Sequence, residues 1–401
     1  MGVDASETQN LLEIPVGNLE PGMYVAALDR PWLETPFAMQ GFLVKDQEDI
    51  DFVAKHAAFV YVDPQKRSKV KAQPRKTVRR TYKDQSSLKR EIETAQVDLT
   101  SASEAIKKVF TQLKQGGDVD VGAVATAINP LIDSVLRNSE ALASLVRMKS
   151  KGDYLYNHSL TMAVWAAIFG RQLGFDRDRL KNLALGAALI DTGMASVADE
   201  IVLETGSLSA SQTKEVRKHV KKGLDILRKS GQLSPDVLEM VATHHERYDG
   251  SGYPRGIKGM DIPVFGRIAG LVDSYDAMIT ERPHAKPRSS FEAMQEIADL
   301  KDQHFQGELV EQFMQAIGLF PTGSVVELNS GEIGVVVQQN ATRRLRPKVI
   351  LVLDDQGNRH EKLVVLDLAK YVNDGENKSD LWIANELQPG AHGIQPNEYF
   401  L

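Results

Sequence analysis

The sequence predicts a mainly α protein, in which a helical domain has a small β-rich N-terminal domain before it and a short β-rich C-terminal extension after it. Apolar residues recur at helical spacing from about residue 86 to 317. Short apolar runs separated by turn residues fill the first 63 residues and return after Pro321. The expected domains are 11–63 (β-rich), 64–84 (basic linker), 85–149 (helical connector), 150–317 (helical domain) and 318–401 (C-terminal extension).

Composition limits the class of protein. The 401 residues, 42% of them hydrophobic, are enough for two or three domains with buried cores. The chain has no cysteine, so any metal must bind imidazole or carboxylate groups. A net charge of -6 argues against nucleic-acid binding by the whole molecule. No signal-peptide pattern is present, and no window approaches the roughly 18 apolar residues of a membrane span. We therefore expect a cytoplasmic protein.

The N-terminal domain is predicted from short runs of β-branched and aromatic residues. Strands are expected at 22–25, 42–44 and 59–62. Between Asp63 and Asp84 the chain then carries nine Lys or Arg and no acidic residue. Such a run could bind nucleic acid or an anionic membrane, but it has no aromatic or apolar pattern. We expect a solvated linker, kept open by repulsion between its charges.

The helical part begins at about Ser86, and Gly116-Gly117 is expected to separate two helices within residues 86–148. A homodimer through these helices is one expectation, although heptad positions a and d are not consistently apolar. Further helices are expected at 153–174, 179–191, 211–230, 234–246, 264–280 and 290–317. Strands of the C-terminal extension are expected at 324–328, 334–338, 348–353 and 362–366.

Histidines of the central helices are the first candidates for a functional site. His158 shares a helix face with Leu155, Met162 and Trp165, so it should point inward. Taken alone, an inward histidine is more often a hydrogen-bonded core residue than a metal ligand. His219, taken alone, is equally compatible with an exposed position.

Carboxylates follow or flank these histidines. Asp191 follows the apolar segment Leu183–Ile190, where a carboxylate is costly unless it is paired, binds a metal or caps the next turn. His244-His245 can face one site only at the wall of a pocket, and Asp273 and Asp276 lie on a following helix. Phosphodiester hydrolysis suits such a set, because two close metal ions can activate water and neutralise phosphate.

The segment His244–Pro254, with the sequence HHERYDGSGYP, resembles the signature of HD-GYP domains. These are bacterial phosphodiesterases of the signalling nucleotide cyclic di-GMP within the HD hydrolase superfamily. Residues 19–25 are similar to a small domain that often precedes HD-GYP domains. The resemblance covers about residues 150 to 315, including Tyr156–Ser159, Lys218-His219 and Leu271–Met278.

The resemblance implies a two-metal site, with Asp191 as the bridging catalytic carboxylate. The implied metal ligands are His158, Asp191, His219, His244, His245 and Asp273. Nitrogen and oxygen donors of this kind suit iron, manganese or zinc. The resemblance also implies that cyclic di-GMP is the ligand and that a cyclic di-GMP synthase is a partner. The implied substrate-binding residues are Gly252, Tyr253, Pro254, Arg282 and Lys286.

Two residues depart from the family pattern, in which a His-Asp pair is followed by Gly-Lys. Here Ile190 stands in place of the histidine and Met194 in place of the lysine. Because isoleucine has no donor atom, we expect one strongly held divalent metal and a second that is weak or absent. Without this lysine, the site lacks a positive charge that would stabilise the substrate phosphate.

Three hypotheses follow. The first is a cyclic di-GMP signalling protein that binds metal and cyclic dinucleotide with weak or absent hydrolysis. The alternative is an active phosphodiesterase giving linear pGpG or GMP, in which water or His284 completes the weak metal position. The third is a non-catalytic interaction module, which contacts its partner through the Gly252–Pro254 loop.

Overall fold

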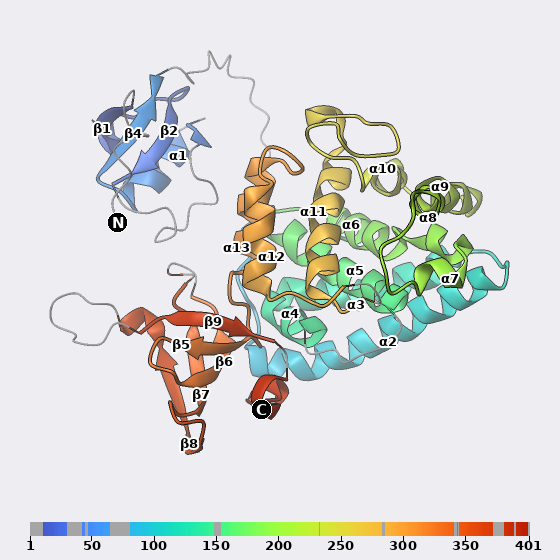
Figure 1. Cartoon of the computed structure of the whole chain (residues 1–401). Helices are drawn as coiled ribbons and strands as arrows, with labels where there is room; N and C mark the ends of the chain where they lie inside the picture. The colour runs from blue at the N-terminus through green and yellow to red at the C-terminus, as the bar shows by residue number, and fades with distance from the viewer. Residues whose placement is uncertain are drawn as a thin grey trace.

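The computed structural model has three parts: a small N-terminal sheet, a large helical domain and a C-terminal sheet (Figure 1). The mainly α fold class is therefore confirmed. Most of the predicted basic linker, and His284, lie outside the described residues. The residues that the structure describes are 11–29, 42–44, 47–64, 81–147, 154–231, 233–282, 285–340, 343, 345–371, 381–388 and 390–399.

The N-terminal domain is an antiparallel sheet with strand order β1-β4-β2-β3, covered by one helix. Its core includes Val25 of β2, Val53 of the helix and Val60 of β4, all fully buried. The first strand and the helix were not expected from the sequence. The elements are β1 Leu12–Pro15, β2 Tyr24–Leu28, β3 Phe42–Leu43, α1 Gln47–Ala54 and β4 Phe59–Asp63.

The helical domain contains twelve helices among the described residues. They are α2 Leu88–Lys114, α3 Val121–Arg137, α4 Ser139–Arg147, α5 Tyr154–Gln172, α6 Arg177–Leu189, α7 Asp199–Val202, α8 Ala210–Arg217, α9 His219–Lys229, α10 Pro235–Thr243, α11 Val264–Ile279, α12 Ser290–Asp299 and α13 Gly307–Ile317. The long helix α2 runs along one side of this bundle (Figure 1). Buried side chains of α2, α3 and α4 belong to the same hydrophobic core as those of α5, α6 and α11.

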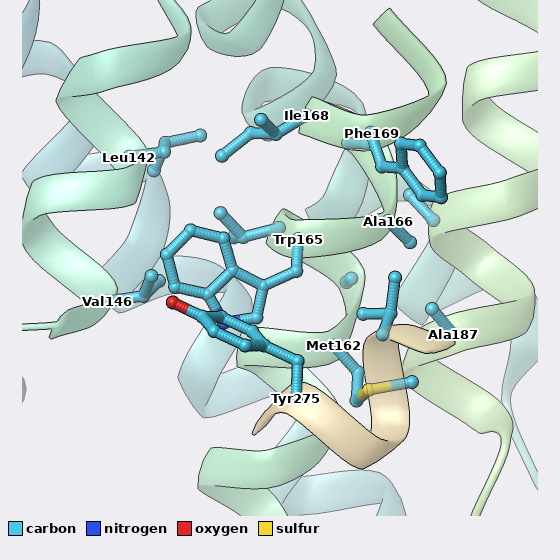
Figure 2. Packing of buried hydrophobic residues seen from close by; sticks show 14 of the residues in the cluster. Leu142, Val146, Met162, Trp165, Ala166, Ile168, Phe169, Ala187 and Tyr275 are labelled. Atoms are coloured by element: carbon cyan, nitrogen blue, oxygen red, sulfur yellow. The ribbon is translucent and has the colours of Figure 1, made fainter. Parts of the chain in front are cut away.

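Helix α5 lies at the centre of this core, which explains why its sequence is apolar on every face. Trp165 of α5 packs edge-on against Tyr275 of α11, with ring centroids 5.8 Å apart. Leu142 and Val146 of α4 lie beside this pair in Figure 2, and all four side chains are buried. Burial of rings of this size is the main contribution to the stability of such a core.

Several expected helix bounds were wrong. The helix expected at 211–230 is two helices, α8 and α9, which meet at Lys218. The helix expected at 290–317 is also two, because α12 ends at Asp299 and α13 begins at Gly307. Two helices were expected within 86–148, but a third, α4, begins after Asn138, whose backbone is extended.

The C-terminal sheet is antiparallel, with strand order β8-β7-β6-β5-β9. Its strands are β5 Val325–Leu328, β6 Ile333–Gln338, β7 Lys348–Leu353, β8 Arg359–Asp367 and β9 Ile383–Leu387. The sheet is fixed to the helical domain by a buried ion pair of 3.0 Å between Arg147 of α4 and Glu386 of β9. Glu386 also accepts a hydrogen bond from the Phe291 backbone N–H. Among the described residues, no helix is both long and apolar enough to cross a membrane.

Candidate metal centre

Asp191 is at the middle of the candidate site. It follows the end of α6 and precedes a short 3-10 turn, Thr192–Ser196, and its side chain makes no capping hydrogen bond to that turn. Instead, its Oδ1 lies 3.4 Å from His219 Nε2, and its Oδ2 lies 3.5 Å from His158 Nε2. The carboxylate therefore presents one oxygen to each of two groups of ligands. The sequence left open whether Asp191 caps the following turn, and the structure shows that it does not.

A close backbone contact brings Asp191 to His219. A Cβ atom at Gly193 would lie 1.9 Å from the backbone oxygen of His219, so no larger residue fits there without movement. Gly223 lies on α9, and a Cβ atom at this residue would lie 3.0 Å from the Gly193 backbone nitrogen. Two glycines thus allow the turn after Asp191 to pack directly on α9.

The first flank of Asp191 consists of three histidines. One ring nitrogen from each of His219, His244 and His245 lies within 4.8 Å of the others. His219 begins α9, whereas His244 and His245 follow the end of α10 at Thr243, so the neighbouring pair is not held to the 100° helical spacing. His219 and His244 are buried, which excludes the exposed position that His219 alone would allow.

The donor chemistry of this flank fits a divalent cation. Nδ1 of His219 donates to the Val216 carbonyl at 2.7 Å, and Nδ1 of His244 donates to the Val241 carbonyl at 2.8 Å. A neutral ring bonded in this way keeps a lone pair on Nε2, and the two Nε2 atoms are 3.3 Å apart. Two imidazole ligands about 2.0–2.1 Å from a tetrahedral ion would be separated by about this distance. Asp191 Oδ1 lies 4.0 Å from His244 Nε2 and can complete the set.

Burial favours the neutral form of His244 and His245. It lowers the pKa of His244 to about 4, helped by the neighbouring His219. Burial and the adjacent His244 hold the pKa of His245 well below its ordinary value. Neutral imidazole is the form that binds a metal, so these two rings can bind one at neutral pH without releasing protons.

The second flank of Asp191 contains His158 and Asp273, with 3.1 Å between His158 Nε2 and Asp273 Oδ1. Burial acts to raise the pKa of Asp273, but the hydrogen bond from His158 and the neighbouring His245 outweigh it, so the pKa lies below its usual range. His245 Nδ1 is 3.7 Å from Asp273 Oδ2 and links the two flanks. All six predicted ligands are thus brought together.

Ile190 belongs to the second flank by its place in the family pattern, and its side chain is fully buried in the main hydrophobic core. Met194 packs against the same core and is half-buried. Among the described residues, the three histidines of the first flank form a group whose candidate ligand atoms all lie within 4.8 Å of one another. The second flank therefore has fewer candidate donors than the first.

Asp276 and Trp165 form a support that the sequence did not predict. His158 Nδ1 donates to Asp276 Oδ2 at 2.7 Å, and Trp165 Nε1 donates to Asp276 Oδ1 at 3.2 Å. The carboxylate is 1% exposed and holds the His158 ring with Nε2 directed at Asp191 and Asp273. Asp276 lies three residues after Asp273 on α11, and this spacing was the available signal.

Tyr253 places the Gly252–Pro254 loop against the first flank. Its ring stacks on His245, with centroids 4.6 Å apart and an interplanar angle of 26°. Its backbone N–H donates to the His245 carbonyl at 3.1 Å. The loop can fold back this closely because a Cβ atom at Gly252 would lie 2.3 Å from the Arg247 nitrogen.

Arg217, a cation at the rim of the site, was also not predicted from the sequence. The Arg217 guanidinium lies 4.8 Å from the centre of the Tyr253 ring, within the range of a cation–π contact. Arg217 ends α8, two residues before His219, and its side chain is exposed. Arg282 and Lys286 were the cations predicted to bind substrate; Arg282 forms a backbone bridge with Ala285, and among the described residues neither shows a contact with the six candidate ligands.

Comparison with known protein families identifies the domains of this chain. The model of the HD domain matches residues 135–309, a domain of unknown function (DUF3391) matches 11–124, and the KOW domain associated with the HD domain matches 325–373. The chain is therefore an HD-domain protein with two accessory domains.

Curated relatives narrow the class further. A cyclic di-GMP phosphodiesterase of Pseudomonas aeruginosa is 31% identical over 350 residues, 84% of each chain. Another from Thermotoga maritima is 33% identical over 40% of this chain and 44% of that protein. A 3'3'-cGAMP-specific phosphodiesterase of Vibrio cholerae is 30% identical over 49% of this chain and 38% of that protein. This chain belongs to the HD-GYP family.

Proposed function

We propose that this protein binds one divalent metal ion tightly, binds cyclic di-GMP, and hydrolyses it weakly or not at all. The asymmetry around Asp191 carries the proposal. One side of the carboxylate faces three convergent imidazoles. The other side has His158 and Asp273, and the family's remaining ligand is replaced by the buried Ile190.

The residues of the first flank would hold the ion through His219, His244, His245 and Asp191 Oδ1. A bound divalent ion supplies charge to a phosphate oxygen and lowers the pKa of bound water. Two-metal catalysis needs a second cation to stabilise the leaving oxygen, and isoleucine cannot contribute an electron pair to it. Binding of the nucleotide can therefore persist where hydrolysis is impaired.

Arg217 and Tyr253 supply the contacts that a cyclic dinucleotide requires. An arginine can donate two hydrogen bonds to a phosphate, and a tyrosine ring can stack on a base. Arg217 contacts Tyr253, and Tyr253 stacks on His245 of the first flank. In this position Arg217 can neutralise a substrate phosphate, which the uncharged Met194 cannot do. We therefore assign Arg217 to substrate binding alongside the loop of Gly252–Pro254.

The stacking of Tyr253 on His245 also bears on the interaction-module hypothesis. A loop used only to contact a partner would have no need to pack its tyrosine on a metal-binding histidine. The contact favours a loop that forms one wall of the nucleotide site. A synthase remains a proposed partner only through its product, cyclic di-GMP.

The test is to purify the protein and measure metal per chain, binding of cyclic di-GMP by calorimetry, and turnover by chromatography of the products. We expect about one tightly held metal, nucleotide binding that needs the metal, and negligible turnover. 3'3'-cGAMP should be assayed in parallel, because a relative acts on it. Rapid hydrolysis by the unmodified protein would disprove the proposal, and metal-independent binding would support the interaction module.

Arg217 has its own test. Arg217→Ala should weaken cyclic di-GMP binding about tenfold, as expected for a lost charged hydrogen bond, and leave metal content unchanged. Arg228→Ala, at an exposed position on α9, is the matched control and should change neither. Equal binding by both variants would remove Arg217 from the site.

A further inference from the structure

The guanidinium of Arg147 joins the helical domain to the C-terminal sheet. Arg147 ends α4, and its side chain is 12% exposed. Its Nη2 donates to Ser324 Oγ and to Glu386 Oε1, each at 3.0 Å. Its Nη1 donates to Ser290 Oγ at the start of α12 and lies 3.5 Å from the Tyr275 hydroxyl of α11. Helices α4, α11 and α12 therefore meet the sheet at one buried cation.

Glu386 balances the charge of this cation. Its side chain is 3% exposed, and among the described residues it is the carboxylate that pairs with the Arg147 guanidinium. Glu386 Oε1 also accepts a hydrogen bond from Ser324 Oγ at 2.6 Å, and Oε2 accepts one from the Phe291 N–H at 2.8 Å. Because a buried charge is costly when its partner is removed, the position of the guanidinium depends on this carboxylate.

Tyr275 connects the same cation to the candidate metal centre. Its ring packs edge-on against Trp165, and Figure 2 shows this pair beside Val146, the residue before Arg147. Trp165 Nε1 donates to the carboxylate that holds the His158 ring. The side chains along this route are almost completely buried. In a close-packed core a displaced ring moves its neighbours, so a shift of the guanidinium should reach His158.

We propose that Glu386 of the C-terminal sheet is a positioning residue of the metal centre. It acts through the Arg147 guanidinium on the rings of Tyr275 and Trp165. These rings in turn support the carboxylate that fixes His158. The inference rests on the proposed role of His158 as a metal ligand, and it makes the C-terminal sheet a working part of the site.

The indole N–H signal of Trp165 in a ¹H–¹⁵N spectrum of the metal-free full chain tests the proposal. The chain has three tryptophans, so the signal can be assigned with Trp165→Phe. Glu386→Gln removes the charge but keeps an oxygen that can accept from the Phe291 N–H. It should shift the Trp165 signal, because the hydrogen bond of the indole and the position of the Tyr275 ring both change. An unshifted signal would overturn the proposal.

Glu91→Gln is the matched control. Glu91 pairs with Arg137 at 2.7 Å, and its side chain is 4% exposed, which is close to the value for Glu386. This variant should lower the temperature of thermal unfolding but leave the Trp165 signal in place, because the chemical shift of the folded state does not depend on global stability. Equal shifts in the two variants would assign Glu386 a merely structural role.

A double-variant cycle tests the route through Arg147. Arg147→Met should shift the Trp165 signal, and adding Glu386→Gln to it should cause little further change, because the intermediate group is already lost. A further shift as large as that of Glu386→Gln alone would exclude this route. If Arg147→Met does not fold, Ser290→Ala takes its place, because Ser290 Oγ accepts from Arg147 and lies 3.0 Å from the Tyr275 hydroxyl.

Metal affinity measures the consequence for the site. In the background Ile190→His/Met194→Lys, which restores the family residues, Glu386→Gln should weaken binding of the second Mn²⁺ ion about threefold. This is less than the tenfold loss typical of a group that contacts the ligand directly. Glu91→Gln should leave it unchanged, and equal affinities in the two variants would count against Glu386. A chain that binds no metal at all would contradict the proposed function, whereas the indole signal would still decide this inference.

Discussion

The two flanks of Asp191 differ in how they satisfy their polar atoms. On the first, His219 and His244 use Nδ1 for backbone carbonyls, and their Nε2 atoms lie 3.3 Å apart. On the second, His158 lies between Asp276 and Asp273. Both of its ring nitrogens thus face carboxylate oxygens of the protein itself.

This difference bears on the proposal that one metal position is lost while the fold is kept. On the first flank two ring nitrogens face each other, and a bound cation would satisfy both of them. The second flank is already a hydrogen-bonded network, completed by Trp165 and Asp276. A hydrophobic residue such as Ile190 is then compatible with the surrounding core.

The largest effect should come from removing a ligand of the first flank. His244→Ala should reduce affinity for the tightly held metal by more than about a hundredfold, because a ligand contributes more than the second-shell groups that tune it. Metal analysis after dialysis against a chelator measures this. His158→Ala is the matched control on the second flank and should retain about one metal per chain. Equal losses would show that the flanks are equivalent.

The next effect should come from restoring the second flank. Ile190→His with Met194→Lys should raise the metal content towards two and increase turnover of cyclic di-GMP about a hundredfold. Leu189→His adds a histidine at the neighbouring buried position and should give no such gain. If the double variant binds a second metal but stays inactive, the catalytic defect lies elsewhere in the site.

A smaller effect should follow from the support of His158. Asp276→Asn keeps the shape of the side chain but removes its charge, so it should weaken the second metal position about tenfold. The change should be seen in the Ile190→His/Met194→Lys variant as a loss of turnover and of the second metal. In the otherwise unmodified chain the tightly held metal should remain. Loss of that metal would mean that Asp276 supports both flanks.

The smallest effect is a pH dependence of the metal-free protein. The pKa of His244 falls from an ordinary 6.5 to about 4 on folding, because the ring is buried. The unfolded chain therefore binds the proton first, and stability should fall as the pH drops from 6.5 towards 4. Chemical denaturation over this range should show a shallower slope for His244→Gln, with His56→Gln in the N-terminal domain as the control. An unchanged slope would contradict burial of a neutral ring.

Much of the candidate site was predictable because its residues occur in a long, specific motif. The sequence placed His158 inward through its spacing from Met162 and Trp165, and the structure buries all three. It did not decide whether Asp191 caps a turn or faces the histidines, since both follow from the same helix end. Whether the six residues act as ligands stays a prediction that metal analysis must test.

Helix number was harder to predict than helix location. Periodicity continues across Lys218 and across residues 300–306, so a single long helix fits the pattern at both places. The chain turns there because of contacts with distant segments, such as the Tyr248 N–H bond to the His304 carbonyl. Strands β1 and β9 were missed for a similar reason: each is short and is stabilised mainly by its partner strands.

The amino-acid sequence was sufficient for the mainly α fold class, the HD-GYP resemblance, and the replacement of a donor by Ile190, because these depend on residue type and local spacing. The asymmetric surroundings of Asp191, the Asp276–Trp165 support and the contact of Arg217 with Tyr253 required the folded chain. They join residues from different helices, and the distances between such residues depend on how the helices pack. Local periodicity determines which face of a helix a side chain lies on, but not which residues of other helices it contacts.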